Sequence, residues 1–194
     1  MGKEKYINEV MEFFKKTPVV STRDIRLIIN KNRTRKNYTH LFVHNSIKSG
    51  RIKKVVKGFY TILEDPTVAV FCFKPAYIGL QDALSLHNLW SQESNVVVIT
   101  VKKVRSGIRR ILDSNIIVRR INPRYFFGFE LIKYGSFYIP VSDVEKTLID
   151  FVYFKEVLDK EVLNEIKRRV DRKKINKYLK RYPERIRKNV ISLL

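Results

Sequence analysis

The first 62 residues constrain the fold most, because three helical patterns are followed directly by two short strand patterns. Apolar residues recur at helical spacing in residues 4–16, 21–30 and 35–49. Residues 51–62 are then rich in β-forming residues on both sides of Gly58, a residue that suits a tight turn. Helix, helix, turn, helix and a two-stranded wing is the order of a winged helix-turn-helix domain.

Local signals set the ends of these helices. Pro18 ends the first one. Ser21, with Asp24 three residues later, predicts a start of the capping-box type for the second. Gly50 suits the C-terminus of the third. We expect the inward side of that third helix to hold Phe42, Val43 and Ile47.

The rest of the chain mixes strand and helix patterns. A continuous β-branched run predicts a buried strand in "SNVVVITVKK". Further expected elements are a helix in 77–89, strands in 115–121 and 125–140, a helix in 141–154, and helix throughout 155–194 with Pro183 in the first turn of the last helix. The sequence therefore predicts an α+β chain, in which an N-terminal winged helix-turn-helix domain precedes a mixed α/β domain with a helical C-terminus.

The composition changes at Glu64, Asp65 and Pro66, which separate the wing pattern from the apolar run "VAVFCF". We place the domain boundary in residues 63–75 and predict two domains, 1–64 and 75–194. The single cysteine, Cys72, lies in the apolar run and is interpreted as a small buried residue, so the chain has no internal disulfide framework.

The formal net charge is +21, which favours a polyanionic partner, nucleic acid before an acidic membrane surface. The high Lys, Arg and Ile content with only two glutamines leans towards a thermophilic source. No stretch approaches the roughly 18 to 20 apolar residues of a membrane span, and the N-terminus mixes charges of both signs, unlike a secretory signal. We expect a cytoplasmic protein without a membrane partner.

The positive charge is dense from Lys31 to Lys57, where no acidic residue occurs. The N-terminal side chains of a recognition helix reach base edges in the major groove, and lysines of a wing reach the phosphate backbone. Arg can bind guanine and Asn adenine. The candidate recognition-helix residues are Arg33, Thr34, Arg35, Lys36, Asn37, His40 and His44, and the candidate wing residues are Arg51, Lys53, Lys54 and Lys57.

Other chemistry finds less support. His40 and His44 have a spacing that can bind a metal from one helix face, but no third ligand is evident. The sequence contains no glycine-rich phosphate loop, nucleophile elbow or HExxH motif. We therefore expect no cofactor, no metal and no catalytic residue.

A metal-dependent nuclease is an alternative, because "SDVEKTLID" contains an acid-x-Lys cluster with Asp143, Glu145, Lys146 and Asp150. The structural interpretation is a Ser142/Glu145 capping box at the start of a core helix. The basic helices after residue 155 are interpreted equally well as a solvated face or as a further nucleic-acid contact.

Residues 21–62 resemble the N-terminal winged helix of the AbiEi-like transcriptional regulators, and "QDALSLHNL" and "DVEKTLID" are similar to hallmark helices of that family's C-terminal domain. The resemblance implies a DNA-binding repressor, often the antitoxin of a type IV toxin–antitoxin pair whose toxin is nucleotidyltransferase-like. It also implies DNA contacts from 33–44 and 51–60, and a core role without catalysis for 142–154. The C-terminal helices are more basic, and the loop "NKNRTRKN" is longer, than in that family.

The predicted function is that of a sequence-specific DNA-binding transcriptional regulator, an autorepressing antitoxin that binds double-stranded operator DNA with inverted repeats and a cognate toxin. Besides the nuclease, the alternative is a charge-driven binder of nucleic acid without sequence preference.

Overall fold

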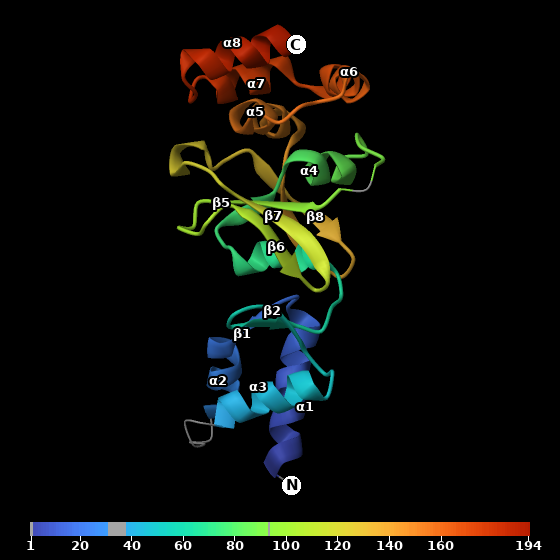
Figure 1. Cartoon of the computed structure of the whole chain (residues 1–194), viewed down its shortest axis with the longest axis vertical. Helices are drawn as coiled ribbons and strands as arrows, with labels where there is room; N and C mark the ends of the chain where they lie inside the picture. The colour runs from blue at the N-terminus through green and yellow to red at the C-terminus, as the bar shows by residue number, and fades with distance from the viewer. Residues whose placement is uncertain (1, 31–37, 93) are drawn as a thin grey trace. The chain divides into compact units, whose positions relative to one another are not determined.

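The structure is a computed structural model that describes residues 2–30, 38–92 and 94–194 (Figure 1). The chain forms two compact units, one of residues 1–72 with 110–114 and one of residues 73–109 with 115–194. The first unit thus takes in part of the segment between the two predicted domains. None of the described helices combines the length and the apolar character that crossing a membrane requires.

The first unit is a winged helix. Its elements are α1 (Gly2–Lys16), β1 (Val20–Ser21), α2 (Thr22–Asn30), α3 (Tyr38–Lys48), β2 (Lys53–Val56), β3 (Phe59–Thr61) and the 3-10 helix η1 (Pro66–Cys72). The strands form an antiparallel sheet in the order β1-β3-β2. The core that joins helices and sheet consists of buried residues from each of them, including Val10, Phe14, Ile25, Phe42 and Tyr60.

The local signals in this unit act as predicted. Ser21 and Asp24 exchange hydrogen bonds at the start of α2: the Ser21 N–H donates to Asp24 Oδ2 over 2.9 Å, and the Asp24 N–H donates to Ser21 Oγ over 3.2 Å. Gly58 turns the hairpin with a φ of +82°, a conformation that costs a glycine little. The Thr22 N–H donates to the Gly58 carbonyl over 2.8 Å, which fastens the wing to the start of α2.

The prediction for α3 is wrong in one place. Ile47 is 38% exposed and is not an inward residue. The buried positions are Thr39, Phe42, Val43 and Ser46, whose spacing of i, i+3, i+4 and i+7 defines a single helix face. Two of these residues are polar, so a prediction based on apolar residues alone chose Ile47 as an inward residue, whereas its neighbour Ser46 is the buried one. The N-terminal part of the predicted helix, 35–37, lies outside the described residues.

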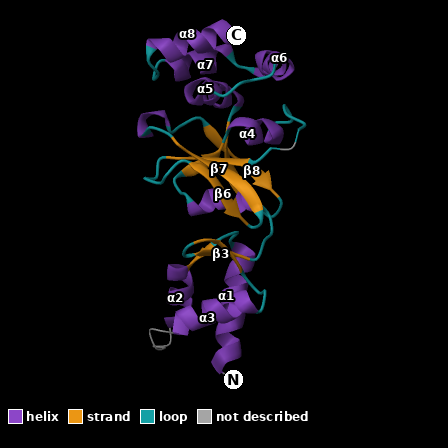
Figure 2. Cartoon of the chain, in the orientation of Figure 1, coloured by secondary structure: helices purple, strands orange, loops and turns teal. Residues whose placement is uncertain are grey.

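The second unit is built on a six-stranded mixed sheet, whose strands are orange in Figure 2. The strand order is β6-β7-β5-β4-β9-β8, and residues 110–114, at the turn between β6 and β7, are counted with the first unit. The strands are β4 (Ala76–Ile78), β5 (Val96–Thr100), β6 (Gly107–Ile111), β7 (Ser114–Arg120), β8 (Phe129–Tyr134) and β9 (Phe137–Ser142). The pairs β4–β9 and β5–β7 are parallel, whereas β4–β5 and β8–β9 are antiparallel. Strand β5 is buried along its whole length, as its β-branched run predicts.

Helices of this unit gather on one side of the sheet (Figure 1). They are α4 (Leu80–Leu86), α5 (Val144–Phe154), α6 (Lys160–Arg169), α7 (Arg172–Leu179) and α8 (Glu184–Leu193), with the 3-10 turn η2 (Pro123–Tyr125) between strands. Helix α5 contacts α4, α7, α8 and strand β9, so it lies at the centre of the unit's core. The α+β fold class, with a winged helix before a mixed α/β part and a helical C-terminus, is the one predicted.

Several boundaries in this unit differ from the predictions. Tyr77 and Ile78 belong to strand β4 because both pair with β5, and α4 begins only at Leu80. Strand β6 was not predicted, and 125–128 are not part of a strand. The segment 155–194 is not helical throughout: Lys155 ends α5 in the left-handed conformation, and breaks follow Arg169 and Leu179. Pro183 is the N-cap of α8, with Glu184 in its first turn.

Gly128 fits a space that no side chain could share. It has a φ of +71°, and a Cβ atom there would lie 2.9 Å from Lys146 Cβ and 3.0 Å from Tyr178 Cε2. Gly135, in the β8–β9 turn, has a φ of +58° but open space around it. Both glycines have a positive φ, but only Gly128 is closely packed against other residues.

We expect Gly128→Ala to lower the free energy of unfolding by about 1–3 kcal/mol more than Gly135→Ala, because only the former overpacks the core. Urea unfolding followed by circular dichroism measures both variants. Equal losses would contradict the close approach of α5 and α7 at Gly128.

Candidate functional site

The wing projects cationic side chains from the β2–β3 hairpin. A bulge between Lys54 and Val56 turns Val55 into the core, where it is 5% exposed, and leaves Lys54 in solvent. Lys57 and Arg51 are also exposed. Lys53 differs from these residues, because its ammonium group forms an ion pair with Glu64. Hydrogen bonding and attraction from Lys53 lower the pKa of Glu64.

The side of helix α3 that faces away from the core carries polar residues and also Leu41, which is 53% exposed. His40 and His44 are exposed and one turn apart, as the recognition-helix prediction requires. Lys48, one turn after His44 on the same face, is exposed and was missed, and Asn45 is exposed on a different side of the helix. The i, i+4 spacing of Lys48 from His44 could have identified it. The remaining predicted residues, Arg33, Thr34, Arg35, Lys36 and Asn37, lie outside the described residues.

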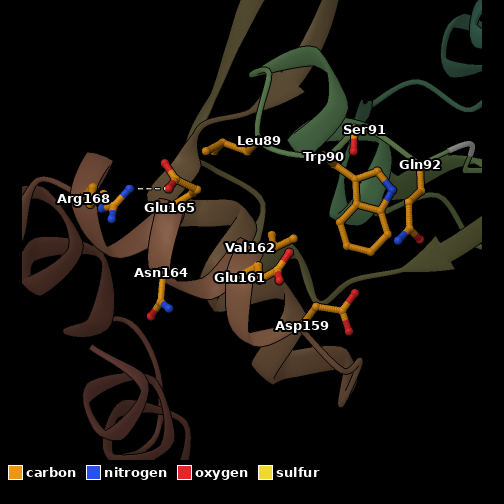
Figure 3. Close-up of a pocket in the computed structure, with 10 residues that line it drawn as sticks. All are labelled: Leu89, Trp90, Ser91, Gln92, Asp159, Glu161, Val162, Asn164, Glu165 and Arg168. Carbon is orange, nitrogen blue, oxygen red and sulfur yellow. Dashed lines mark hydrogen bonds and ion pairs between the residues drawn. The ribbon is translucent and has the colours of Figure 1, made fainter.

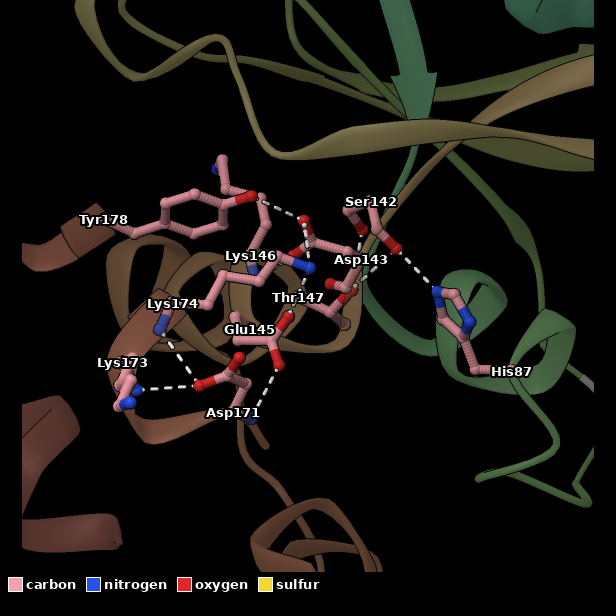
Figure 4. Close-up of polar contacts among 10 residues, drawn as sticks. All are labelled: His87, Ser142, Asp143, Glu145, Lys146, Thr147, Asp171, Lys173, Lys174 and Tyr178. Atoms are coloured by element: carbon pink, nitrogen blue, oxygen red, sulfur yellow. Dashed lines mark hydrogen bonds and ion pairs between the residues drawn. The ribbon is translucent and has the colours of Figure 1, made fainter. Parts of the chain in front are cut away.

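The acidic residues of the acid-x-Lys cluster in the second unit bind other residues of the protein (Figure 4). Asp143 is the N-cap of α5, and its carboxylate accepts a hydrogen bond of 2.7 Å from the Lys146 N–H. The predicted Ser142/Glu145 capping box is therefore wrong. Ser142 ends β9, and its hydroxyl lies 2.7 Å from Thr147 Oγ1. The side chain of Asp143, one residue later, caps the helix instead.

Asp143 and Glu145 fasten α7 to the start of α5. Lys174 lies 3.1 Å from Asp143 Oδ2 and 2.8 Å from Glu145 Oε2. The Tyr178 hydroxyl donates to Asp143 over 2.8 Å, and the Asp171 N–H donates to Glu145 over 2.9 Å. Both carboxylates are thus occupied by partners from the protein. Among the described residues, no group of three His, Cys, Asp or Glu side chains is arranged to hold a metal ion.

The contacts between α5 and α7 raise the pKa values of Lys174 and Tyr178, two of the residues that form them. Burial opposes the charge on Lys174, but hydrogen bonds and attraction from Glu145 and Asp143 outweigh burial and raise the pKa of Lys174. Burial and the hydrogen bond to Asp143 raise the pKa of Tyr178 to about 12. Lys174 therefore stays charged and Tyr178 stays a donor at neutral pH, which keeps the contact between α5 and α7 intact.

A second ionic contact lies deeper in the core. Lys146 and Asp150, one turn apart on α5, form an ion pair in which both side chains are completely buried. The buried Tyr77 hydroxyl donates to Asp150 Oδ2 over 2.7 Å. The Lys146 ammonium group also lies 5.4 Å from the Tyr77 ring centroid and 5.7 Å from that of Phe127, distances of cation–π contact.

Burial and pairing act in opposite directions on these charges. Burial lowers the pKa of Lys146 and raises the pKa of Asp150, whereas the attraction between the two groups favours the charged form of each. Burial and Asp150 together raise the pKa of Tyr77, which keeps its hydroxyl a donor. The pair ties α5 to β4, because Asp150 binds one residue of that strand. Its geometry suits positioning of the core and leaves no carboxylate open to a substrate.

We expect Lys146→Met to lower the free energy of unfolding by about 3–5 kcal/mol at neutral pH, because it leaves Asp150 buried without its counter-charge. The double variant Lys146→Met/Asp150→Leu should recover most of the loss. Lys188→Met, which removes an exposed pair with the same i, i+4 spacing to Glu184, is the matched control and should change little.

The loss of unfolding free energy that Lys146→Met causes should become smaller as the pH falls from 7 towards 4. In this variant burial raises the pKa of Asp150 above the ordinary 3.8 of the unfolded chain, with no lysine to oppose the shift. The folded state then binds a proton more tightly than the unfolded state, so stability is retained at low pH and lost as the pH rises through the folded pKa. Chemical unfolding at several pH values measures this, and a pH-independent loss would contradict the ionic role of the pair.

Neither a family model nor a curated protein matches this sequence. Among solved structures, the crystal structure of the RV2827C protein from Mycobacterium tuberculosis is similar, with a TM-score of 0.63 and 12% sequence identity. The similarity covers 98% of this chain and 76% of that chain. At this identity the likeness concerns the fold, and it extends over both units of the chain.

Proposed function

We propose that the chain is a sequence-specific DNA-binding transcriptional regulator whose winged helix binds operator DNA. The observation that carries the proposal is the winged helix itself, with exposed Arg51, Lys54 and Lys57 on its wing and no acidic residue in 31–57. Lysines at these positions neutralise phosphates beside the groove in which the third helix lies.

The outer face of α3 is the base-reading surface in this proposal. His40 and His44 present donors and acceptors to base edges, while Lys48 and the wing position the helix on the backbone. The recognition-helix prediction for residues 33–37 stays a prediction, because these residues lie outside the described part of the chain. The resemblance to AbiEi-like regulators supports the further proposal of a cytoplasmic, autorepressing antitoxin of a type IV toxin–antitoxin system, in which the second unit serves the toxin.

We expect Lys54→Ala/Lys57→Ala to weaken binding to every duplex by a similar factor. Each phosphate contact contributes about 0.9 to the slope of log affinity against log salt, so loss of two contacts should reduce the slope by about 1.8. Fluorescence anisotropy over a salt series measures affinity and slope together.

The matched control for this variant is Lys103→Ala/Lys133→Ala, which removes two exposed lysines from the second unit. It changes the net charge equally and should leave the slope unchanged. If both double variants reduce the slope to the same extent, the wing is not the phosphate-binding element.

Glu64→Gln should tighten DNA binding. The substitution removes the carboxylate that pairs with Lys53 and frees this lysine for a phosphate, so the salt slope should become steeper by about 0.9. Glu130→Gln, at an exposed position of β8, is the control for the change in charge alone. Weaker binding of Glu64→Gln would mean that the Lys53–Glu64 pair holds the wing in its binding shape.

A further inference from the structure

The second unit contains a pocket of about 490 Å³ between the end of α4 and helix α6 (Figure 3). This volume lies in the usual range of ligand sites. Leu89 and Val162 supply apolar surface, Trp90 an aromatic wall, and Asp159, Glu161 and Glu165 carboxylates.

The chain reversal after α4 positions the aromatic wall. Asn88 adopts the left-handed conformation with a φ of +56°, and the Leu89 N–H donates back to the Leu84 carbonyl over 2.8 Å. This is the Schellman arrangement, which ends a helix and folds the next residue onto it. Leu89 consequently packs in the core, and Trp90 follows it at the pocket.

Helix α6 supplies the charged wall. Glu161, Glu165 and Arg168 have i, i+4 and i+7 spacing and therefore share one face of the helix. Asp159 is the N-cap residue of α6, but its side chain makes no capping hydrogen bond. Arg168 lies 2.5 Å from Glu165 and compensates for one carboxylate. The charged residues that line the pocket are these four, three acids and one base.

Such a lining is unusual for this chain, which carries 40 basic and 19 acidic residues. The pocket has a formal charge of −2 (three carboxylates less one guanidinium) on a protein of +21. Carboxylates next to an indole ring bind an ammonium or guanidinium group through ion pairing and cation–π attraction. The chemistry of the wall therefore selects a cationic ligand.

The indole nitrogen adds a second requirement. Trp90 Nε1 is buried, and no described residue accepts a hydrogen bond from it. A buried donor without an acceptor costs free energy, which a ligand carrying an acceptor can recover. Gln92, which also lines the pocket, is exposed. A free polyamine offers cations but no acceptor, whereas a polypeptide offers both.

We propose that this pocket binds an arginine or lysine side chain of a partner polypeptide. The cationic group pairs with Glu161 and Asp159 over the Trp90 ring, and a peptide carbonyl of the same segment accepts from Trp90 Nε1. All residues that line this pocket belong to the second unit, whereas the wing and α3 belong to the first.

Trp90 is the single tryptophan of the chain, and its indole N–H gives one unambiguous cross-peak in a ¹H–¹⁵N spectrum. The full chain is titrated with acetyl-glycyl-arginyl-glycinamide, with the glutaminyl analogue, and with spermidine, all at the same ionic strength. We expect a saturable shift of the indole peak with the arginyl peptide alone. Asp159→Asn/Glu161→Gln should weaken that binding at least tenfold, while Glu130→Gln leaves it unchanged.

Three results would overturn the proposal. If the arginyl and glutaminyl peptides bind equally well, or if neither peptide binds, the pocket does not recognise the cation. Binding of spermidine as tight as that of the peptide would assign the pocket to a free polyamine. A shift of the indole peak with protein concentration in the absence of peptide would show that a second copy of this chain occupies it. Trp90→Phe, which keeps an aromatic wall but has no N–H, should bind the arginyl peptide more weakly than the unsubstituted chain in a competition assay.

Discussion

The buried ion pair of Lys146 and Asp150 fixes how α5 packs on β4 in the second unit. Two charges without solvent are stable only if their position relative to each other and to Tyr77 is fixed, so the register of α5 against β4 is specified by electrostatics as well as by packing. Helix α5 in turn contacts α4, α7 and α8. The clamp of Asp143 and Glu145 on Lys174 extends the same constraint to the first turn of α7.

This use of acidic residues also shapes the surface. Asp143, Glu145 and Asp150 are buried and bind residues of their own unit, so they do little to offset the exposed cations. Residues 167–188 contain twelve Lys and Arg against two acidic residues, Asp171 and Glu184. Glu64 differs from the buried acids, because it is exposed and pairs with Lys53 of the wing. A basic surface of this kind favours association with polyanions, and the carboxylate-lined pocket at Trp90 is an exception to it.

The winged helix could be predicted from sequence because its signals are local. Helical periodicity, the Ser21–Asp24 pair and Gly58 each act within a few residues of the chain. The errors occurred where distant residues decide the outcome. Tyr77 and Ile78 form a strand because β5 lies beside them, and Lys146 is buried because its partners include Tyr77, far away in the sequence. Ser142 was predicted to cap α5, but it belongs to strand β9, and Asp143 caps the helix. Of the candidate site, the exposure of His40, His44 and the wing lysines followed from pattern, whereas the pairing of Lys53 with Glu64 did not.

The measurement that tests the central claim most directly is an anisotropy titration of the full chain against duplex DNA from its own upstream region and against a scrambled duplex of equal length and composition. The titration is repeated across a series of salt concentrations. A specific regulator should prefer the native duplex by about a thousandfold or more at physiological salt. Equal affinities for the two duplexes that fall together as salt rises would contradict it and would show that the wing binds phosphate without reading sequence.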